Sequence, residues 1–297
     1  MDSKKLTIKR LAIFYILAIL PLIGFSAGLT AVFGEPAFAS ENPEALKWAG
    51  FFGTAAMFAP AIAHILTRLI TKEGWRNTYL GFTAKKGNIG YFAFSVFYKP
   101  VESLLFIIVI WLLFLNGMNF AEAFDFSQPV GKASVFLFQL AGSVIIFFPA
   151  FGEEWGWRGY MMPKLLELMP KPAAIITGGV LWGLWHAPLT VIGHNFGVDY
   201  PGFPFAGIAV MCAVCIITNA VLTFLTERTR SIYPASFCHM INNNLSPFIF
   251  MSLFFSGEAA AAINEKLSPI LIFTAYAVLA LVTGAICFVL FIRKKKD

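Results

Sequence analysis

The chain of 297 residues is 58% hydrophobic and 13% charged, with a mean hydropathy of +0.74 and a formal net charge of +6. Soluble domains hold about 45–50% apolar and about 25% charged residues, so the composition excludes a water-soluble globule and predicts an all-α membrane protein. The basic residues lie in short stretches between apolar runs, which is typical of orientation signals and not of a nucleic-acid-binding surface.

Apolar runs long enough to cross a bilayer recur along the whole sequence, since a transmembrane helix needs about 20 such residues. We expect eight crossings in a single membrane domain over residues 1–297. They cover residues 11–33, 49–70, 95–116, 134–155, 173–191, 205–226, 232–255 and 268–292. The first run is longer than the apolar core of a signal peptide, which has about 7–15 residues. We therefore expect it to be a retained helix. The third is the weakest, because Lys99 and Glu102 lie near its start, where a helix end is expected.

The distribution of basic residues predicts the orientation of these crossings. If the N-terminus is cytoplasmic, eight crossings bring the C-terminus to the same side. All basic residues then lie inside except Lys47, Lys99, Lys132 and Lys266, as the positive-inside rule requires. Segments 71–87 and 293–297 are expected to lie against the anionic inner leaflet. We expect a multi-pass protein of a prokaryotic cell membrane.

The four cysteines all lie within apolar runs. Cys212 and Cys215 have the spacing of a CxxC motif, but no second pair accompanies them. We therefore expect small buried side chains and not a redox or metal site.

Polar side chains interrupt the apolar runs at three places, although a charge at mid-depth costs at least about 2.5–3.5 kcal/mol. These side chains are Glu153, Glu154 and Arg158, then His186, then His239 and Asn243. Residues at i and i+4 share one helix face, and this spacing joins Glu154 to Arg158, Trp182 to His186, and His239 to Asn243. Such pairs predict side chains that face the interior of a helix bundle.

Distance along the helices predicts that these groups meet. Glu153 and His186 both lie roughly 25 Å from the inside turn at 169–172, at 1.5 Å per residue. His239 reaches a similar level if that hairpin projects into the cytoplasm. The glycines at 152, 156 and 159 would let a neighbouring helix approach closely.

A carboxylate, two imidazoles and an amide at one level inside a membrane suggest a hydrolytic site. A carboxylate held away from bulk water becomes a stronger base toward a bound water molecule. Imidazole and amide N–H groups can stabilise a developing oxyanion. Alternatively, Glu153, His186 and His239 could bind Zn²⁺, which would activate water instead.

The order Glu-Glu-x-x-x-Arg, aromatic-x-x-x-His and His-x-x-x-Asn resembles the CPBP family of CAAX prenyl proteases and Abi proteins, which are intramembrane endopeptidases. The resemblance covers about residues 130–255, flanked by residues 1–129 and 256–297. It implies that Glu153 is the base on water, assisted by His186, and that His239 and Asn243 stabilise the oxyanion. Glu154 and Arg158 would support the site. Trp182 stands where the family usually has Phe.

The resemblance implies cleavage of a membrane-associated, lipidated or peptide-precursor substrate, with a prenylated protein among the candidates. No cofactor is required for the glutamate mechanism, whereas zinc is required for the alternative. The substrate, the oligomeric state and the activity of this copy stay open. Two other readings compete: a non-catalytic scaffold or peptide-immunity protein of the same fold, and a proton-coupled transporter, although repeated halves are absent.

Three further interpretations concern one ion pair and two histidines. The pair Glu154–Arg158 can also be read as an interfacial ion pair at a helix end. His64 is expected to be a packed or interfacial histidine without a polar companion at helical spacing, and His194 is expected on an outside loop.

Overall fold

The computed structural model describes residues 3–82, 88–245 and 247–292, and these residues form helices with one isolated antiparallel bridge between Phe124 and Phe255. The all-α, multi-pass architecture is therefore confirmed. Lys85, Lys86 and the basic stretch 293–297, which were expected to contact the inner leaflet, lie outside the described residues.

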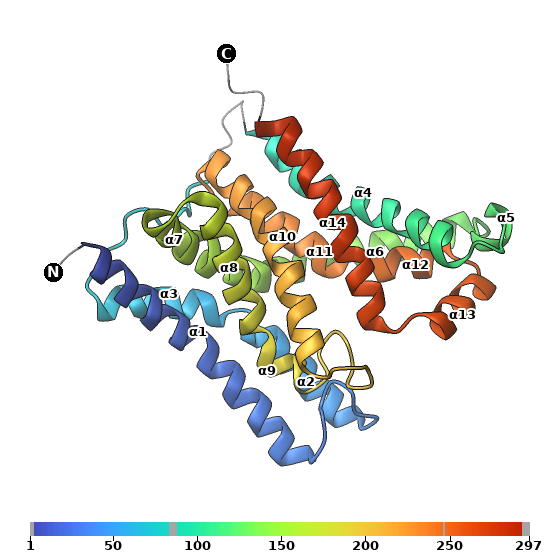
Figure 1. The fold of residues 1–297 in the computed structure, drawn as a ribbon, viewed down its shortest axis with the longest axis horizontal. Helices are drawn as coiled ribbons and strands as arrows, with labels where there is room; N and C mark the ends of the chain where they lie inside the picture. The colour runs from blue at the N-terminus through green and yellow to red at the C-terminus, as the bar shows by residue number, and fades with distance from the viewer. Residues whose placement is uncertain (1–2, 83–87, 246, 293–297) are drawn as a thin grey trace.

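Figure 1 shows the helices in their arrangement in space. They are α1 (Ser3–Phe33), α2 (Pro43–Ala56), α3 (Ala59–Ile70), α4 (Ile89–Phe114), α5 (Phe120–Ala123), α6 (Pro129–Gly156), a π-helical turn (Trp157–Met161), α7 (Met162–Leu168), α8 (Lys171–Trp185), α9 (Ala187–Thr190), α10 (Phe205–Thr229), α11 (Tyr233–Asn244), α12 (Pro247–Phe254), α13 (Gly257–Lys266) and α14 (Pro269–Ile292).

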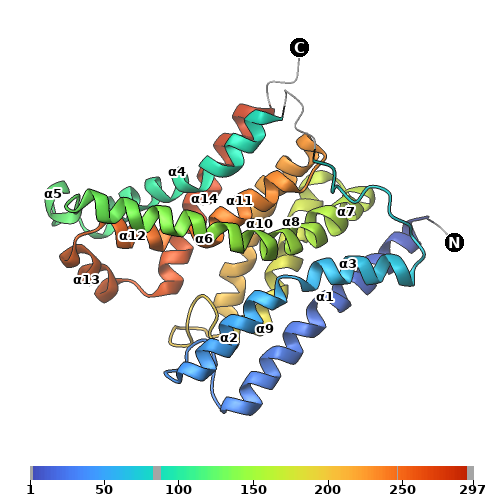
Figure 2. The same ribbon diagram turned by 180° about the vertical axis from the view of Figure 1, so that it is seen from behind.

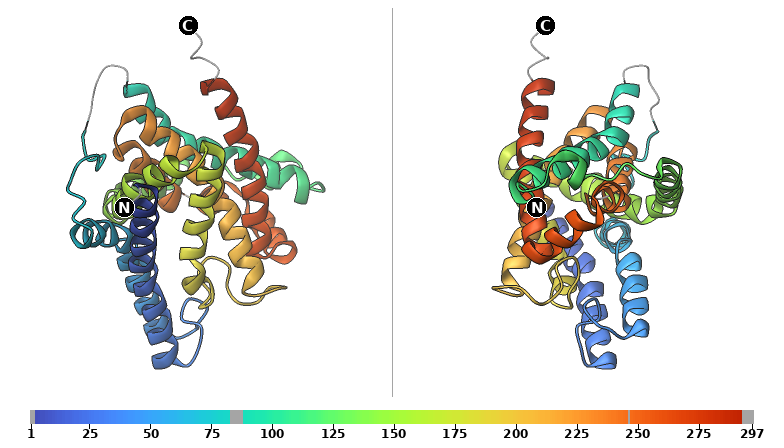
Figure 3. Two further views of the ribbon diagram at one scale, coloured as in Figure 1. Left: turned by 60° about the vertical axis from the view of Figure 1, so that its left-hand side comes forward. Right: turned by 90° about the vertical axis from the view of Figure 1, so that its right-hand side faces the viewer.

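Antiparallel neighbours form the centre of the molecule. In Figure 1, α1 and α8 run downward, whereas α10 and α14 run upward. Seen from behind, α6 crosses the molecule from α5 towards α7 (Figure 2), and α1 lies beside α2 and α3 at one edge (Figure 3). In this arrangement α8 packs on α10, and α11 packs on α4 and α6.

The expected count of eight crossings is not confirmed. Within the described residues, five stretches are long and apolar enough to span a membrane: Ser3–Phe33, Pro43–Ile70, Ile89–Phe114, Pro129–Leu168 and Phe205–Thr229. The pair Gly257–Lys266 and Pro269–Ala285, bent by 99°, makes a sixth if it is one broken span. The side of the bilayer that holds the termini stays a prediction, as does the single-domain reading of residues 1–297.

Two of the expected crossings are instead short helices packed against protein. The run 173–191 yields α8, which has 15 residues and ends at Trp185. The run 232–255 is divided into α11, with 12 residues, and α12, with 8. At 1.5 Å per residue, none of these reaches the roughly 30 Å of a hydrocarbon core. Hydropathy detects such helices without showing that other helices cover them.

Glycines allow the closest helix contacts, as expected for Gly152 and Gly156. A Cβ at Gly156 would lie 2.5 Å from the backbone carbon of Pro60 in α3, and one at Gly152 would lie 3.2 Å from the Cα of Phe58. A second contact joins α8 to α10, where a Cβ at Gly179 would lie 2.3 Å from the Cα of Ile216. Small residues at such contacts let helix backbones approach closely in membranes.

We expect Gly179→Ala to destabilise the protein, because its methyl group would meet the backbone of α10 and not a flexible side chain. Overpacking of this kind costs about 1–3 kcal/mol, which should lower the thermal unfolding temperature in detergent. Gly28→Ala in α1 is the matched control, since its added Cβ meets nothing within 4 Å. Equal unfolding temperatures for the two variants would contradict this prediction.

Two of the cysteines behave as the sequence predicts. Cys215 and Cys238 are buried free thiols, and Cys212 is partly buried.

The charged pair in α4 differs from its prediction. Lys99 and Glu102 were expected near a helix end, but they lie inside α4 with 2% and 1% of their surface exposed. Helix α4 begins further upstream than its apolar run, at Ile89.

Candidate active site

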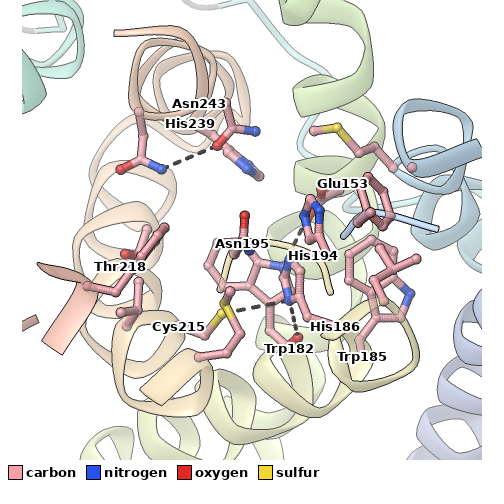
Figure 4. Close-up of a pocket in the computed structure, with 18 of the residues that line it drawn as sticks. Glu153, Trp182, Trp185, His186, His194, Asn195, Cys215, Thr218, His239 and Asn243 are labelled. Carbon is pink, nitrogen blue, oxygen red and sulfur yellow. Dashed lines mark hydrogen bonds between the residues drawn. The ribbon is translucent and has the colours of Figure 1, made fainter. Parts of the chain in front are cut away.

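A cavity of about 580 Å³ opens between α6, α8, α10, α11 and α14 (Figure 4). Its lining contains Glu153, His186, His239 and Asn243, which are the four side chains predicted to be catalytic. They belong to α6, to the end of α8 and to α11. The fold thus brings together four polar side chains that are separated by up to 90 positions along the chain.

Glu153 reaches the cavity from the last turn of α6, with 2% of its surface exposed. Its Oε2 atom accepts a hydrogen bond of 2.9 Å from the indole N–H of Trp182 and a longer one of 3.3 Å from Trp157. No hydrogen bond from the described residues occupies Oε1. One carboxylate oxygen is therefore held by the protein, and the other remains for a ligand.

Trp182 does more at this site than the phenylalanine of the family pattern could do. Phenylalanine has no N–H group, so it could not donate the bond that holds Glu153. The guanidinium carbon of Arg158 lies 4.1 Å from the centroid of the indole ring, within the range of a cation–π contact. The indole thus contacts both Glu153 and Arg158.

Glu154 and Arg158 form a fully buried ion pair where α6 passes into the π-helical turn. The distance from Arg158 Nη1 to Glu154 Oε1 is 2.9 Å, and neither side chain is exposed. Neither side chain lines the cavity. Each instead contacts a residue that does, because Arg158 stacks on Trp182 and Glu154 accepts a bond from His239.

His239 is oriented by this second carboxylate. Its Nδ1 atom lies 2.8 Å from Glu154 Oε1, and its ring packs edge-on against Trp182 at a centroid distance of 5.5 Å. A carboxylate accepts only, so Nδ1 carries a proton in this contact. The Glu154 contact therefore fixes both the ring plane and the protonation of one nitrogen.

His186 is the residue that ends α8. Its Nδ1 atom lies 2.9 Å from the carbonyl oxygen of Trp182, so Nδ1–H donates and Nε2 carries the lone pair in the neutral ring. The ring packs edge-on against Trp185 at 4.8 Å, and the Cys215 sulfur lies 3.9 Å from Nδ1. These contacts make His186 suited to accept a proton or a hydrogen bond through Nε2.

Asn243 lies one helical turn beyond His239, on the exposed rim of the cavity. Its Oδ1 atom accepts a hydrogen bond of 3.2 Å from Asn242. The next residue, Asn244, points to α6 and donates to Ser143 Oγ at 2.8 Å. That contact holds the end of α11 against α6 and so fixes the place of Asn243.

A π-helical turn follows the two glutamates directly. It covers Trp157–Met161 and precedes Pro163 at the start of α7. Proline has no N–H to continue the helical ladder, and π-turns frequently occur at functional sites. The turn contains both Trp157, which bonds Glu153, and Arg158, which pairs with Glu154.

Two other histidines are more engaged than the sequence indicates. His194 does lie on the loop between α9 and α10, but it also lines the cavity and packs on Phe38 at 4.6 Å. Burial lowers the pKa of His194 to about 4, which leaves its ring neutral at pH 7. His64 is packed, as expected, yet it accepts a bond of 2.6 Å from Arg68 at i+4. That spacing was visible in the sequence, whereas the approach of the His194 loop was not.

The zinc alternative finds no ready set of ligands. Among the residues that the structure describes, no three His, Cys, Asp or Glu side chains come close enough together to hold a metal ion. Glu153, His186 and His239 share the cavity, and the Nδ1 atoms of both histidines are held by a carbonyl or carboxylate oxygen. Because zinc-binding histidines commonly make such a contact through the nitrogen that does not hold the metal, these contacts do not decide between the two mechanisms.

The fold and the cavity together define a helical, multi-pass integral membrane protein with a buried carboxylate–imidazole site. Residues 135–245 match the family model of the Rce1-like type II CAAX prenyl endopeptidases. CAAX prenyl protease 2 of Methanococcus maripaludis is 31% identical over 97 residues, which is 33% of this chain and 36% of that relative. The two matches confirm the resemblance to the CPBP family. The matched segment contains all seven of the predicted site residues, whereas α1 to α5 and α12 to α14 lie outside it.

Proposed function

We propose that this protein is an intramembrane endopeptidase in which Glu153 activates a water molecule. The observation that carries the proposal is the convergence of Glu153, His186, His239 and Asn243 on one cavity. Such a cavity joins a base, a proton acceptor and hydrogen-bond donors, which are the parts that peptide hydrolysis requires. The likeness of residues 135–245 to CAAX prenyl endopeptidases supports the same reaction.

The first step is attack of water on the substrate carbonyl carbon. Glu153 Oε1 takes one proton from the water as its oxygen bonds to that carbon, and the carbonyl π electrons move to oxygen. Indole donation to Oε2 holds the carboxylate in place during the transfer. His186 accepts a hydrogen bond from the same water through Nε2 and so orients it.

The second step is collapse of the tetrahedral oxyanion. Asn243 and His239 donate hydrogen bonds to this oxygen before collapse. His239 can donate through Nε2 only as an imidazolium, since Nδ1–H already points to Glu154. The buried Glu154 carboxylate stabilises that positive charge. As the C–N bond breaks, Glu153 returns its proton to the leaving nitrogen, which gives a carboxylic acid and an amine.

We propose a prenylated C-terminal peptide as the substrate class to test first, because the similar protein of Methanococcus maripaludis is named for that activity. The experiment compares two internally quenched CAAX peptides, one farnesylated on its cysteine and one without the lipid, with purified protein in proteoliposomes. We expect faster cleavage of the farnesylated peptide, with the bond identified by mass spectrometry. Cleavage of neither peptide, combined with ion or solute flux, would favour a transporter instead.

We expect treatment with a zinc chelator to leave the cleavage rate unchanged, because Glu153 is proposed to activate water directly. Metal content of the purified protein should be measured on the same sample. Loss of cleavage on chelation that is restored by added Zn²⁺ would contradict the glutamate mechanism and favour a metal-assisted one.

A further inference from the structure

A second buried polar cluster joins α4 to α14, outside the segment that matches the family model. At its centre, Lys99 Nζ lies 2.7 Å from Glu102 Oε2, and neither side chain has more than 3% of its surface exposed. Their partners on α14 lie more than 170 positions away along the chain. The cluster therefore fixes one flanking helix against the other.

The carboxylate of Glu102 is saturated with donors. Its Oε1 accepts from the hydroxyls of Tyr98 at 2.9 Å and Thr283 at 2.8 Å. Its Oε2 accepts from Lys99 and, at 2.5 Å, from the hydroxyl of Tyr276. Lys99 Nζ also donates to that Tyr276 hydroxyl at 3.1 Å. Lys99, Glu102 and Tyr276 thus form a closed triangle.

A cluster of this kind fixes the positions of its side chains more than it stabilises the folded protein. Removing two charges from water is costly, and replacing a buried ion pair by apolar residues is often neutral or stabilising. Charged residues inside membranes, in turn, usually face a functional interior. What a saturated cluster does provide is one defined position for each of its members.

One member of the cluster connects it to the candidate active site. Tyr276 lines the same cavity as Glu153 and His239, beside Ile272 and Phe273 of α14. Tyr98 and Thr283 donate to the same carboxylate but do not line the cavity. The part of the cavity wall that Tyr276 forms thus rests on a charged pair in α4.

We propose that Tyr276 is a positioning residue of the active site, held in the cavity wall by the Lys99–Glu102 pair. This inference rests on the proposed endopeptidase function. The ring of Tyr276 shapes the space for the substrate, and its hydroxyl anchors that ring to α4. The flanking helices therefore determine how the substrate binds, while the matched segment carries the chemistry.

Three matched variants test the proposal, since Tyr276→Phe, Tyr98→Phe and Thr283→Val each remove one hydroxyl donated to Glu102. All three should lower the unfolding temperature, Tyr276→Phe the most, because its hydroxyl also accepts a bond from Lys99. With the farnesylated peptide, only Tyr276→Phe should raise KM, by about 3–10-fold, the effect of about one hydrogen bond, because its ring is no longer anchored to α4. The value of kcat should stay unchanged, because the residues that act on the peptide bond are intact.

A second measurement does not require cleavage. Cys215 also lines the cavity, so its rate of alkylation by a small maleimide, in protein whose other three cysteines are replaced by alanine, reports the state of the wall. We expect faster alkylation in Tyr276→Phe only. Equal KM and alkylation rates in all three variants would overturn the inference. Selective alkylation in protein that cleaves no peptide would support the inference about the wall and count against the proposed function.

Discussion

Replacing Glu153 by glutamine is expected to lower kcat for peptide cleavage by about 10²–10⁴-fold, the usual contribution of a general base. Glutamine keeps the size of the side chain and an oxygen that can accept the indole bonds of Trp182 and Trp157. It cannot take a proton from water at neutral pH. The rate should be measured with the farnesylated quenched peptide, and the unfolding temperature should match that of the wild-type protein.

Trp182→Phe provides a graded companion to the glutamine variant. It keeps an aromatic ring over Arg158 but removes the shorter of the two bonds that orient Glu153. We expect a rate between those of the wild-type and Glu153→Gln proteins. Undiminished cleavage by Glu153→Gln would end the assignment of Glu153 as the base, whatever the result for Trp182→Phe.

The second large effect is expected from Glu154→Ala, which leaves the guanidinium of Arg158 buried without its carboxylate. Removing one partner of a buried pair costs about 3–5 kcal/mol, because the remaining charge is uncompensated. Arg158 already has two buried nitrogen atoms, Nε and Nη2, without a partner among the described residues. The protein has little means of satisfying this charge in another way. Denaturant unfolding in detergent would measure the loss.

The double variant Glu154→Met with Arg158→Leu separates stability from catalysis. It removes both charges and should recover most of the stability that Glu154→Ala loses. Cleavage should stay low, because His239 loses the acceptor for its Nδ1–H and so its orientation. A double variant that is as unstable as the single one, or one that cleaves normally, would contradict the role given to Glu154.

The convergence of the candidate site residues on one cavity was predictable because each is a polar residue in apolar surroundings. Glu153, His186 and His239 interrupt apolar runs, and helical spacing joins two of the groups to a neighbour on the same face. The partners of these side chains were less visible. Whether the indole N–H of Trp182 reaches Glu153, and whether Glu154 pairs with Arg158 alone or also with His239, depends on rotations that spacing does not fix.

The number of crossings and the long-range partners were harder to predict than the convergence of the polar side chains on one cavity, for two physical reasons. Hydropathy measures how apolar a run is, but it does not separate a helix that faces lipid from one whose apolar residues pack on other helices, as Ala174 and Trp182 of α8 do. Long-range partners carry no local pattern either. Lys99 and Glu102 look like residues of a helix end until Tyr276 and Thr283, on the last helix, supply their hydroxyl groups.

The shortness of α8 and α11 has a consequence for the supply of the second reactant. Both helices end beside the cavity, at Trp185 and Asn244. The polar side chains at these two ends, His186 and Asn243, line the cavity, and a polar group left without a partner in hydrocarbon costs several kcal/mol. Ends of this kind favour a hydrated pit below the membrane surface. The lipid-anchored substrate proposed above would then reach the cavity laterally through the bilayer. The water molecule that is consumed in the cleavage would enter from solution.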